Sequence, residues 1–332
     1  MHNVAIIGAG TMGKRHLLSW TSIDSANVKY QYDIRKDIVK QLVDGRNIIV
    51  PDDFENVLKD DEVDIVDVCV PTYLHKRYAI DAMKAHKNVF CEKPLSLTVE
   101  DSLEIIKTAE KHNVKFMVGQ VVRFFPQYAN AKKAIERGEI GNPAIARFER
   151  LSQFPHGWND WYADFTKSKG LIFDMSIHDI DFARWCFGDI ERIYAKTLTD
   201  QKLKFKEHAL ITMRMKNGVM VHIEGSWARP SSFTYNFEIV GTNGMIDFNS
   251  ERTMPVLKEI SNNNELNTGV QVPESPLKLE PYAAELKHFL DIIDNGVTPI
   301  VSPYDAAWDV KLALLAIKSA EKNKVIEVGE KL

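Results

Sequence analysis

The stretch VAIIGAGTMG (residues 4–13) decides the fold, because a strand-length apolar run leads directly into a glycine-rich turn. Gly8 permits a tight turn, Gly10 lets the backbone approach an anion, and Gly13 lets the next helix pack close to the strand. The N–H groups at the start of that helix favour a phosphate. Twenty residues after Gly13, Asp33 ends the next strand-like run. This spacing predicts a dinucleotide-binding βαβ unit, and a turn without a ligand is the alternative.

The side chains after the second strand bear on the choice between NAD and NADP. The carboxylate of Asp33 can accept hydrogen bonds from both ribose hydroxyls of NAD and would repel a 2′-phosphate. Arg35 and Lys36 weaken this preference, because they fit either phosphate recognition or the solvated start of a helix. We therefore expect NAD, with NADP possible.

Length and composition limit the class of protein. The 332 residues suggest about two domains, and the apolar share of 45%, the charged share of 27% and the mean hydropathy of -0.24 are typical of soluble globular chains. A net charge of -4 provides no basic surface for nucleic acid, and no membrane segment is expected. The three cysteines lack metal-binding spacing. We therefore expect a cytoplasmic protein without a metal.

Periodicity changes about a third of the way along the chain. Apolar runs alternate first with amphipathic stretches, which predicts a parallel sheet with strands at 4–7, 28–32, 65–70, 88–91 and 115–118 and helices at 73–85 and 99–112. Alternating strands then follow at 209–215, 219–227, 233–240 and 245–248, with turns at Asn217–Gly218 and Asn243–Gly244. Two helices close the chain, one ending near Gly296 and one capped by Ser302. We predict an α/β protein: a Rossmann domain over 1–122, then an α/β substrate-binding and oligomerisation domain with an open, mainly antiparallel sheet over 123–332.

The tripeptide EKP (Glu92, Lys93, Pro94) follows the predicted strand at 88–91. Ligands of an open parallel sheet bind beyond the carboxyl ends of its strands, so Lys93 is directed at the predicted binding site. An ordinary surface lysine is the alternative. Glu92 could pair with Lys93 or orient it.

Asp174 and His178 are four residues apart in a predicted helix and therefore share a face. A structural ion pair is one alternative, and a metal site is another, but no third and fourth ligand accompany them in a recognisable pattern. An imidazole titrates near neutrality, which suits a base that accepts a proton from an alcohol. An ammonium group such as that of Lys93 could hold the alcohol oxygen, and Asp174 could orient either group.

Taken together, these motifs make the chain similar to the Gfo/Idh/MocA oxidoreductases over essentially its whole length. The family's GxGxxG resembles Gly8, Gly10 and Gly13, its EKP resembles residues 92–94, and its catalytic Asp and His resemble Asp174 and His178. PTYLH, with His75, and VVRFFPQY, with Arg123, also resemble family segments. Lys169 precedes Gly170 where a Gly pair is usual, and Thr72 and Tyr73 lie where an Asn is common. Because Thr72 and Tyr73 replace the usual Asn, the details of the cofactor contacts are expected to differ from the family pattern.

The resemblance implies particular site residues and a homodimer or homotetramer, since the open sheet often forms the oligomer interface. Lys93, Asp174 and His178 would be catalytic. The expected cofactor contacts are Gly8, Gly10, Thr11, Met12, Gly13, Asp33, Arg35, Pro71, Thr72, His75, Glu92 and Lys93.

Residues that would choose the substrate are harder to identify. QFPHGWNDWYADF contains His156, Trp158, Trp161 and Tyr162, whose flat faces and polar tips suit a sugar ring, although a buried aromatic cluster is equally consistent. Arg123 and Tyr282 are further candidates. The segment DMSIHDIDFARW most resembles inositol dehydrogenases, which favours a cyclitol or pyranose.

The leading hypothesis is an NAD(P)-dependent dehydrogenase that acts on the CH–OH group of a cyclitol, sugar or related polyol. The alternatives are an NADPH-dependent reductase of a keto sugar or imine, an enzyme that cleaves glycosides by transient oxidation, and a catalytically silent NAD-binding regulator.

Overall fold

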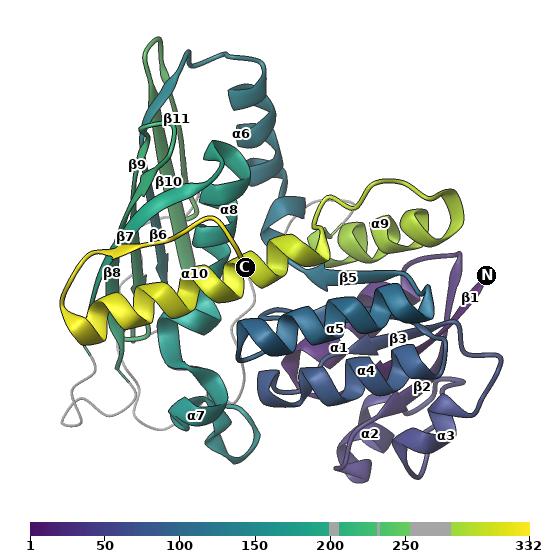
Figure 1. The fold of residues 1–332 in the computed structure, drawn as a ribbon. Coiled ribbons are helices and arrows are strands. Elements are labelled where there is room, and N and C mark those ends of the chain that lie inside the picture. Colours follow the sequence, from purple (N-terminus) through teal and green to yellow (C-terminus); the bar gives the residue numbers. More distant parts are fainter. Residues whose placement is uncertain (199–205, 231–232, 253–279) are drawn as a thin grey trace. The chain divides into compact units, whose positions relative to one another are not determined.

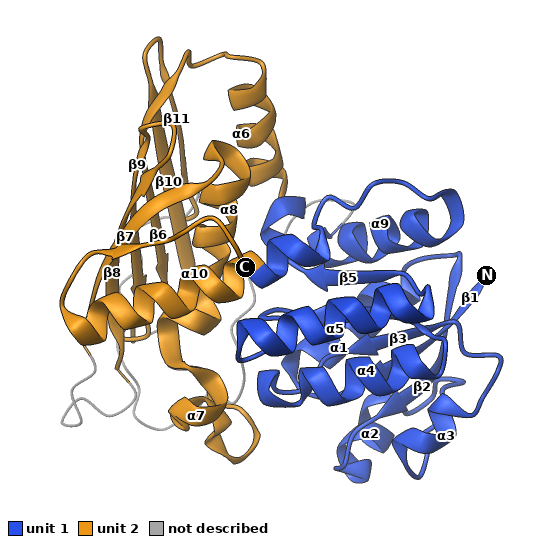
Figure 2. Ribbon diagram, viewed as in Figure 1, with its two compact units in different colours: residues 1–124, 275–307 blue, residues 125–274, 308–332 orange. Residues whose placement is uncertain are grey.

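A computed structural model describes residues 1–198, 206–230, 233–252 and 280–332 (Figure 1). The chain divides into two compact units (Figure 2). Unit 1 comprises residues 1–124 and 275–307, and unit 2 comprises residues 125–274 and 308–332.

Unit 1 is built on a parallel sheet whose strands, apart from the edge strand at Ala26–Tyr32, are buried along most of their length, as the apolar runs predict. Its order is β2 (Ala26–Tyr32), β1 (His2–Ile7), β3 (Ile65–Val68), β4 (Asn88–Glu92) and β5 (Phe116–Gly119). An isolated parallel bridge between Tyr30 and Ile49 extends the pairing beyond β2. The five predicted strands and the Rossmann arrangement are confirmed.

Helices cover both faces of this sheet, which explains why its inner strands β1, β3 and β4 are largely apolar. They are α1 (Thr11–Thr21), α2 (Lys36–Leu42), α3 (Phe54–Leu58), α4 (His75–Lys84), α5 (Val99–His112) and α9 (Pro281–Asn295), with short 3₁₀ turns η1 (Thr72–Leu74) and η2 (Val121–Phe124). Helix α5 begins where Thr98 accepts a hydrogen bond from the Asp101 backbone N–H. Helix α9 ends at Gly296, whose φ of 64° is the left-handed conformation that glycine favours.

Helix α9 belongs to unit 1, whereas the sequence prediction assigned all of 123–332 to the second domain. Leu286, Phe289 and Leu290 of α9 share one buried core with Val4 of β1 and Trp20 of α1. This apolar face closes the first domain, although about 150 residues of the second separate α9 from β5. The first break between units, after residue 124, lies close to the predicted boundary.

Unit 2 contains a mixed sheet in the order β11 (Met245–Asn249), β10 (Thr234–Gly241), β6 (Pro143–Leu151), β9 (Met220–Ser226), β8 (His208–Met215), β7 (Ile190–Leu198) and β12 (Ile326–Glu327). Within this second sheet, only the β6–β9 pairing is parallel among the described strands. The mainly antiparallel sheet and the predicted turns at Asn217–Gly218 and Asn243–Gly244 are confirmed. Strands β6 and β7 were not predicted, because charged residues interrupt their apolar patterns.

Helices α6 (Pro126–Glu136) and α8 (Ile177–Phe187) lie on one face of this sheet (Figure 1). The unit also contains the short η3 (Trp158–Ala163), α7 (Phe165–Ser168) and η4 (Ile172–Ser176). Helix α10 (Pro303–Lys322) begins in unit 1 and continues into unit 2. Its predicted cap is confirmed, since the Asp305 backbone N–H donates to the Ser302 hydroxyl at 3.1 Å.

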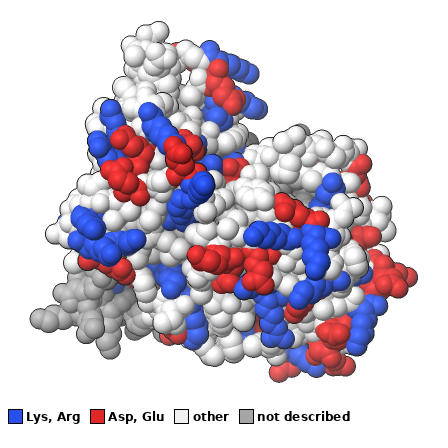
Figure 3. Space-filling view, in the orientation of Figure 1, with Lys and Arg blue, Asp and Glu red and all other residues white. Residues whose placement is uncertain are grey.

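Acidic and basic side chains are intermixed on the molecular face drawn in Figure 3. That face therefore has no continuous basic stripe of the kind that binds a nucleic acid backbone. Among the described residues, no helix combines the length and apolar character needed to cross a membrane.

Candidate functional site

In the glycine turn after β1, Gly8 and Gly13 are packed closely against backbone atoms, whereas Gly10 borders open space. A Cβ on Gly8, whose φ is 111°, would lie 2.4 Å from the Cys69 carbonyl oxygen, and one on Gly13 would lie 1.9 Å from the Gly8 carbonyl oxygen. At Gly10, by contrast, no atom lies within 4 Å of the added Cβ. No side chain caps the N-terminus of α1. The turn therefore fits the pyrophosphate of a dinucleotide, which requires this close backbone approach.

Thr11 and Met12, which the sequence predicts as cofactor contacts, are the first two residues of α1. Met12 is half-buried and packs against the core of unit 1. Its side chain therefore supports the turn from the protein side.

Asp33 lies just after β2 and is directed back at the glycine turn. Its Oδ2 accepts a hydrogen bond from the Ala9 backbone N–H at 2.8 Å, and Arg35 binds the same carboxylate with its backbone N–H and its guanidinium. Burial by itself would raise the pKa of Asp33, but these hydrogen bonds outweigh it and hold the pKa below its usual value. The carboxylate is therefore held as an anion beside the glycine turn.

The loop after β3 carries Pro71, Thr72 and His75. Pro71 precedes the 3₁₀ turn η1, and Thr72 within it is buried. His75 is 1% exposed, and its two ring nitrogens lie 2.8 Å from the carbonyl oxygens of Val70 and Pro94. Burial lowers the pKa of this histidine. His75 thus connects the loop after β3 with the EKP turn, a supporting position rather than an exposed binding surface.

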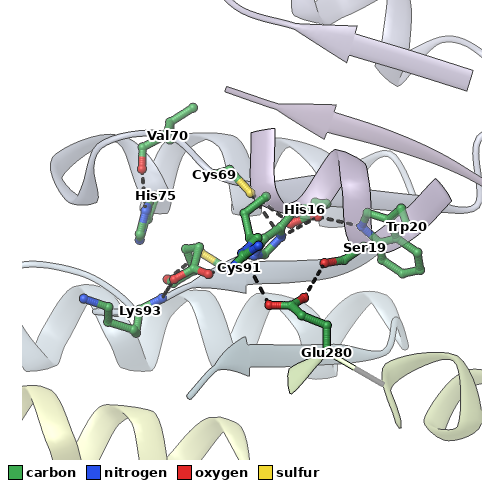
Figure 4. Close-up of polar contacts among 12 residues, drawn as sticks. His16, Ser19, Trp20, Cys69, Val70, His75, Cys91, Lys93 and Glu280 are labelled. Carbon is green, nitrogen blue, oxygen red and sulfur yellow. Dashed lines mark hydrogen bonds and ion pairs between the residues drawn. The ribbon is translucent and has the colours of Figure 1, made fainter. Parts of the chain in front are cut away.

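The EKP turn follows β4 at the same edge of the sheet as the glycine turn. Glu92 is buried, and its Oε2 accepts a hydrogen bond from the Lys93 backbone N–H at 3.1 Å. The Lys93–Pro94 peptide bond is cis. Figure 4 shows the half-buried side chain of Lys93 extending away from His16 and Cys69, which lie deeper in the unit.

A buried polar cluster behind this turn was not predicted from the sequence. His16 of α1 is fully buried, with Nδ1 2.8 Å from Asp67 Oδ2 and Nε2 2.9 Å from Glu92 Oε1 (Figure 4). Cys69 Sγ lies 3.3 Å from His16 Nδ1. The available signal was a histidine on the inner face of an amphipathic helix, three residues after Gly13.

In unit 2, Asp174 lies in the π-helical turn η4, and His178 lies in the first turn of α8. The sequence predicted one continuous α-helix with the two residues on one face, so the π turn is a local difference. Such turns are frequent at functional sites. Asp174 is 8% exposed and His178 is half-buried.

Two residues that the sequence did not single out support this turn. The Leu171 backbone N–H donates to the Glu207 carboxylate at 2.8 Å, which satisfies a donor at the start of the helical segment. Burial, with the nearby charge of Asp174, raises the pKa of Glu207. Gly225 of β9 allows close packing, since its Cβ would lie 2.5 Å from the Ser176 hydroxyl.

Helix α8 is fixed to the sheet by a buried ion pair. Arg150 of β6 donates from Nε and Nη2 to the two carboxylate oxygens of Asp179, at 3.0 and 2.8 Å, and also to the Tyr128 hydroxyl at 3.0 Å. Asp179 directly follows His178. The pair therefore sets the rotation of the turn that carries the imidazole.

The predicted aromatic segment divides into exposed and buried residues. Trp158 is 40% exposed, and the half-buried His156 lies with Nδ1 3.2 Å from Asp160 Oδ1. Trp161 and Tyr162 are each 8% exposed, with ring centroids 3.9 Å apart. Trp161 and Tyr162 thus form the aromatic cluster that was the alternative, whereas Trp158 and His156 remain accessible to a ligand.

The structure places Arg123 and Tyr282 in supporting positions. Arg123 is 3% exposed and donates to the Ile300 carbonyl oxygen at 2.6 Å. Tyr282 is 5% exposed at the start of α9, between Arg15 and His16. These contacts hold α9 and the following loop within unit 1, and the role of both residues as substrate contacts stays a prediction.

Comparison with known proteins matches both parts of the chain to one family. Residues 2–120 match the model described as "Oxidoreductase family, NAD-binding Rossmann fold", and residues 128–247 match the "GFO/IDH/MocA C-terminal domain". "Uncharacterized oxidoreductase YrbE" of Bacillus subtilis (strain 168) is 33% identical over 263 residues, which are 77% of this chain and 75% of that protein.

Two further similarities extend over almost the whole chain. "Myo-inositol 2-dehydrogenase" of Thermotoga maritima is 28% identical over 337 residues, which cover 98% of each chain. The solved structure of GenD2 from gentamicin A biosynthesis, in complex with NAD, has a TM-score of 0.88 at 22% identity and covers 99% of this chain and 97% of its own. The fold, the two matched models and the glycine turn agree: this chain belongs to the Gfo/Idh/MocA family of NAD-binding oxidoreductases.

Proposed function

We propose that this chain oxidises a secondary alcohol of a cyclitol or pyranose, with NAD as the hydride acceptor. The observation that carries the proposal is the placement of Lys93 after β4, at the sheet edge where the glycine turn follows β1. A cation at this edge can hold a substrate oxygen beside a bound dinucleotide.

Each proposed catalytic residue has one role. A bound NAD would supply the acceptor for the hydride of the alcohol carbon. Lys93 donates a hydrogen bond to the alcohol oxygen and stabilises the negative charge that develops there. His178 accepts the hydroxyl proton as the C=O bond forms, and Asp174 orients the imidazole or the lysine. His178 then releases the proton to water, which balances the reaction.

The substrate class is supported by relatives and by side chains of unit 2. The Thermotoga relative is named as a dehydrogenase of myo-inositol. The exposed Trp158 offers a flat apolar face, and the neighbouring His156 offers polar atoms, a combination that suits a ring with hydroxyls on its edge. We infer that these two side chains contact the substrate ring.

NAD is the preferred cofactor in this proposal. The carboxylate of Asp33 lies within hydrogen-bonding distance of the glycine turn, where it would accept from ribose hydroxyls and repel a 2′-phosphate. Arg35, which binds Asp33, is the residue on which NADP binding would depend.

We also propose a homodimer or homotetramer that uses the open face of the unit 2 sheet. Leu198, Leu210 and Met220 project from the same face of neighbouring strands, with exposed fractions of 51%, 52% and 39%. Analytical ultracentrifugation of the parent and Leu210→Glu tests the assembly, and two identical monomeric profiles would reject it.

We also propose a cytoplasmic location. It fits the cysteines, since the structure describes all three and none forms a disulfide.

The decisive experiment is a substrate panel run in parallel with NAD and NADP. It includes inositol isomers, pyranoses and linear polyols, with formation of NADH or NADPH as the readout. We expect turnover with at least one cyclic polyol and a higher kcat/KM with NAD. Tight NAD binding without turnover of any alcohol, or of any ketone in the reverse direction, would favour a regulator instead.

A further inference from the structure

The buried cluster centred on His16 connects three elements of unit 1. His16 lies on α1, Asp67 on β3 and Glu92 on β4, and both ring nitrogens of His16 lie within hydrogen-bonding distance of a carboxylate oxygen. Asp67 Oδ2 also accepts from Trp20 Nε1 at 2.7 Å. The histidine is therefore the only described side chain that directly bridges Asp67 and Glu92 by hydrogen bonds.

Charge and burial identify the protonation state of this bridge. A protonated imidazole carries hydrogen on both ring nitrogens and can donate to both of these oxygens. Burial by itself would lower the pKa of His16, but Asp67 and the neighbouring groups hold it well above its usual value. The raised pKa favours the protonated ring, whose hydrogen bonds to the two carboxyl groups are charge-assisted.

The bridge reaches the EKP turn through Glu92. One oxygen of Glu92 accepts from His16 at 2.9 Å, and the other accepts from the Lys93 backbone N–H at 3.1 Å. His16 lies three residues after Gly13, in the helix whose N-terminus faces the predicted pyrophosphate. A continuous chain of contacts therefore runs from the cofactor-binding helix to the backbone of Lys93.

We propose that His16 is a positioning residue, which fixes the Lys93 backbone relative to the glycine turn through its hydrogen bond to Glu92. This inference rests on the proposed function, in which Lys93 holds the substrate oxygen. An error of about 1 Å in the placement of such a group costs up to about 100-fold in rate.

A metal site is the principal competing interpretation of the same residues. His16, Glu92 and Glu285 are buried with potential ligand atoms within 4.8 Å of one another. An imidazolium has no lone pair left for a metal, however, because both nitrogens donate to carboxylates. The hydrogen-bonded bridge therefore accounts for the geometry without an ion.

Two variants of His16 separate its two hydrogen bonds. In His16→Asn the amide lies near the Nδ1 position and can still donate to Asp67, but it is too short to reach Glu92. In His16→Gln the amide reaches approximately the Nε2 position and can donate to Glu92. Trp20→Phe is the matched control, because it removes another buried hydrogen bond to Asp67 while leaving the bond to Glu92 in place.

We expect His16→Asn to lower kcat about 10- to 50-fold, with the KM for the polyol and the Kd for NAD within about threefold of the parent. His16→Gln should recover kcat to within about fivefold, and Trp20→Phe should retain kcat despite a lower Tm. Equal kcat losses in His16→Asn and His16→Gln, or the same loss in Trp20→Phe, would overturn the proposal. Stoichiometric metal in the purified parent that disappears in His16→Asn would do so too.

A second readout does not depend on turnover. The rate at which an amine-reactive reagent modifies Lys93, measured by mass spectrometry with and without NAD, reports the position of its side chain. We expect NAD to protect Lys93 in the parent and in His16→Gln, and to protect it at least about fivefold less in His16→Asn. Equal protection in all three proteins would reject the positioning role. If the three proteins differ in the protection of Lys93 as expected but the parent oxidises no alcohol, only the proposed function is rejected.

Discussion

The carboxylate of Asp33 and the guanidinium of Arg35 form a two-point ion pair, with Nε 2.8 Å from Oδ1 and Nη2 2.7 Å from Oδ2. The backbone N–H groups of Ala9 and Arg35 donate to the same two oxygens. Each carboxylate oxygen thus already accepts two hydrogen bonds, which is its normal capacity. Ribose hydroxyls can bind Asp33 only if the Arg35 side chain moves away, so Arg35 competes with NAD for this carboxylate.

Substitution of Arg35 should therefore strengthen the binding of NAD. In Arg35→Met the carboxylate of Asp33 keeps its backbone donors and gains free lone pairs for the ribose. We expect the Kd for NAD to fall about three- to tenfold, while the Kd for NADP rises because a cation near the 2′-phosphate is lost. Calorimetric titration with both dinucleotides measures this. Weaker NAD binding in Arg35→Met would show that the guanidinium contributes to the NAD site instead.

Asp33→Ser is the complementary change. Loss of a charged acceptor for the ribose hydroxyls should lower kcat/KM for NAD about 10- to 100-fold, since a hydrogen bond to a charged group contributes about 1.5–3 kcal/mol. The ratio of kcat/KM for NADP to that for NAD should rise, because Arg35 becomes available to the 2′-phosphate. Steady-state kinetics with each cofactor test this, and an unchanged ratio would remove Asp33 from cofactor selection.

The buried Glu285 should make stability depend on pH. Neither of its oxygens has a hydrogen-bond partner among the described residues, and burial, with the charge of Glu92, raises its pKa well above the usual 4.5. At a pH between 4.5 and this raised pKa, Glu285 is ionised in the unfolded chain and takes up a proton when the chain folds. The contribution of Glu285 to the free energy of unfolding is therefore largest below pH 4.5 and falls, by up to about 1.4 kcal/mol per pH unit, until the raised pKa is passed.

Glu285→Gln removes this proton uptake. We expect the variant and the parent to have similar urea midpoints near pH 4.5 and the variant to be the more stable at pH 8, because only the parent must protonate a buried acid there. Glu55→Gln is the control, since that side chain is 61% exposed. A difference between Glu285→Gln and the parent that does not change with pH would contradict the buried, protonated carboxyl.

Removal of one charged partner of the Arg150–Asp179 ion pair should lower the free energy of unfolding strongly. Asp179→Asn leaves a buried guanidinium without its anion, so we expect a loss of about 3–5 kcal/mol in the free energy of unfolding. The double variant Arg150→Met, Asp179→Leu should recover most of it, because both charges are removed together. Urea denaturation measures both, and a single variant within about 1 kcal/mol of the parent would contradict this account.

The close approach of Gly225 to Ser176 predicts a steric effect on the π turn. In Gly225→Ala the new methyl group would lie 2.5 Å from the Ser176 hydroxyl, so this hydroxyl, in the turn that holds Asp174, must move. We expect a loss of about 1–3 kcal/mol in stability and a lower kcat. Adding Ser176→Gly should restore both, and the absence of such rescue would argue against a clash at this position.

Much of the fold was predictable because local patterns and tertiary packing agree. The apolar runs, the turn at Asn217–Gly218 and the Ser302 cap each encode their own structure. Helix α9 could not be assigned to unit 1, because the residues that complete its core, such as Trp20, are far away in the sequence. Strand β6 was missed because its buried Arg150 resembles a surface residue until Asp179 is seen beside it.

The candidate site likewise contains some residues that could be predicted from the sequence and others that could not. The glycine turn, Asp33 and the EKP tripeptide were predictable, since their function depends on short, ordered spacings. The bridge from His16 to Asp67 and Glu92 was not, because three separate elements must fold together before its hydrogen bonds exist. The contacts of Tyr282 with Arg15 and His16 were not predictable for the same reason, because they exist only once α9 packs against α1.

The most direct test of the central claim compares hydride transfer in the parent, Lys93→Met and His178→Ala on the best alcohol of the panel, with the Kd for NAD measured on the same preparations. We predict that each substitution lowers turnover by about two to four orders of magnitude and leaves the Kd within about threefold of the parent. Turnover at the parent's rate in either variant would contradict the assignment of these two residues to the chemistry.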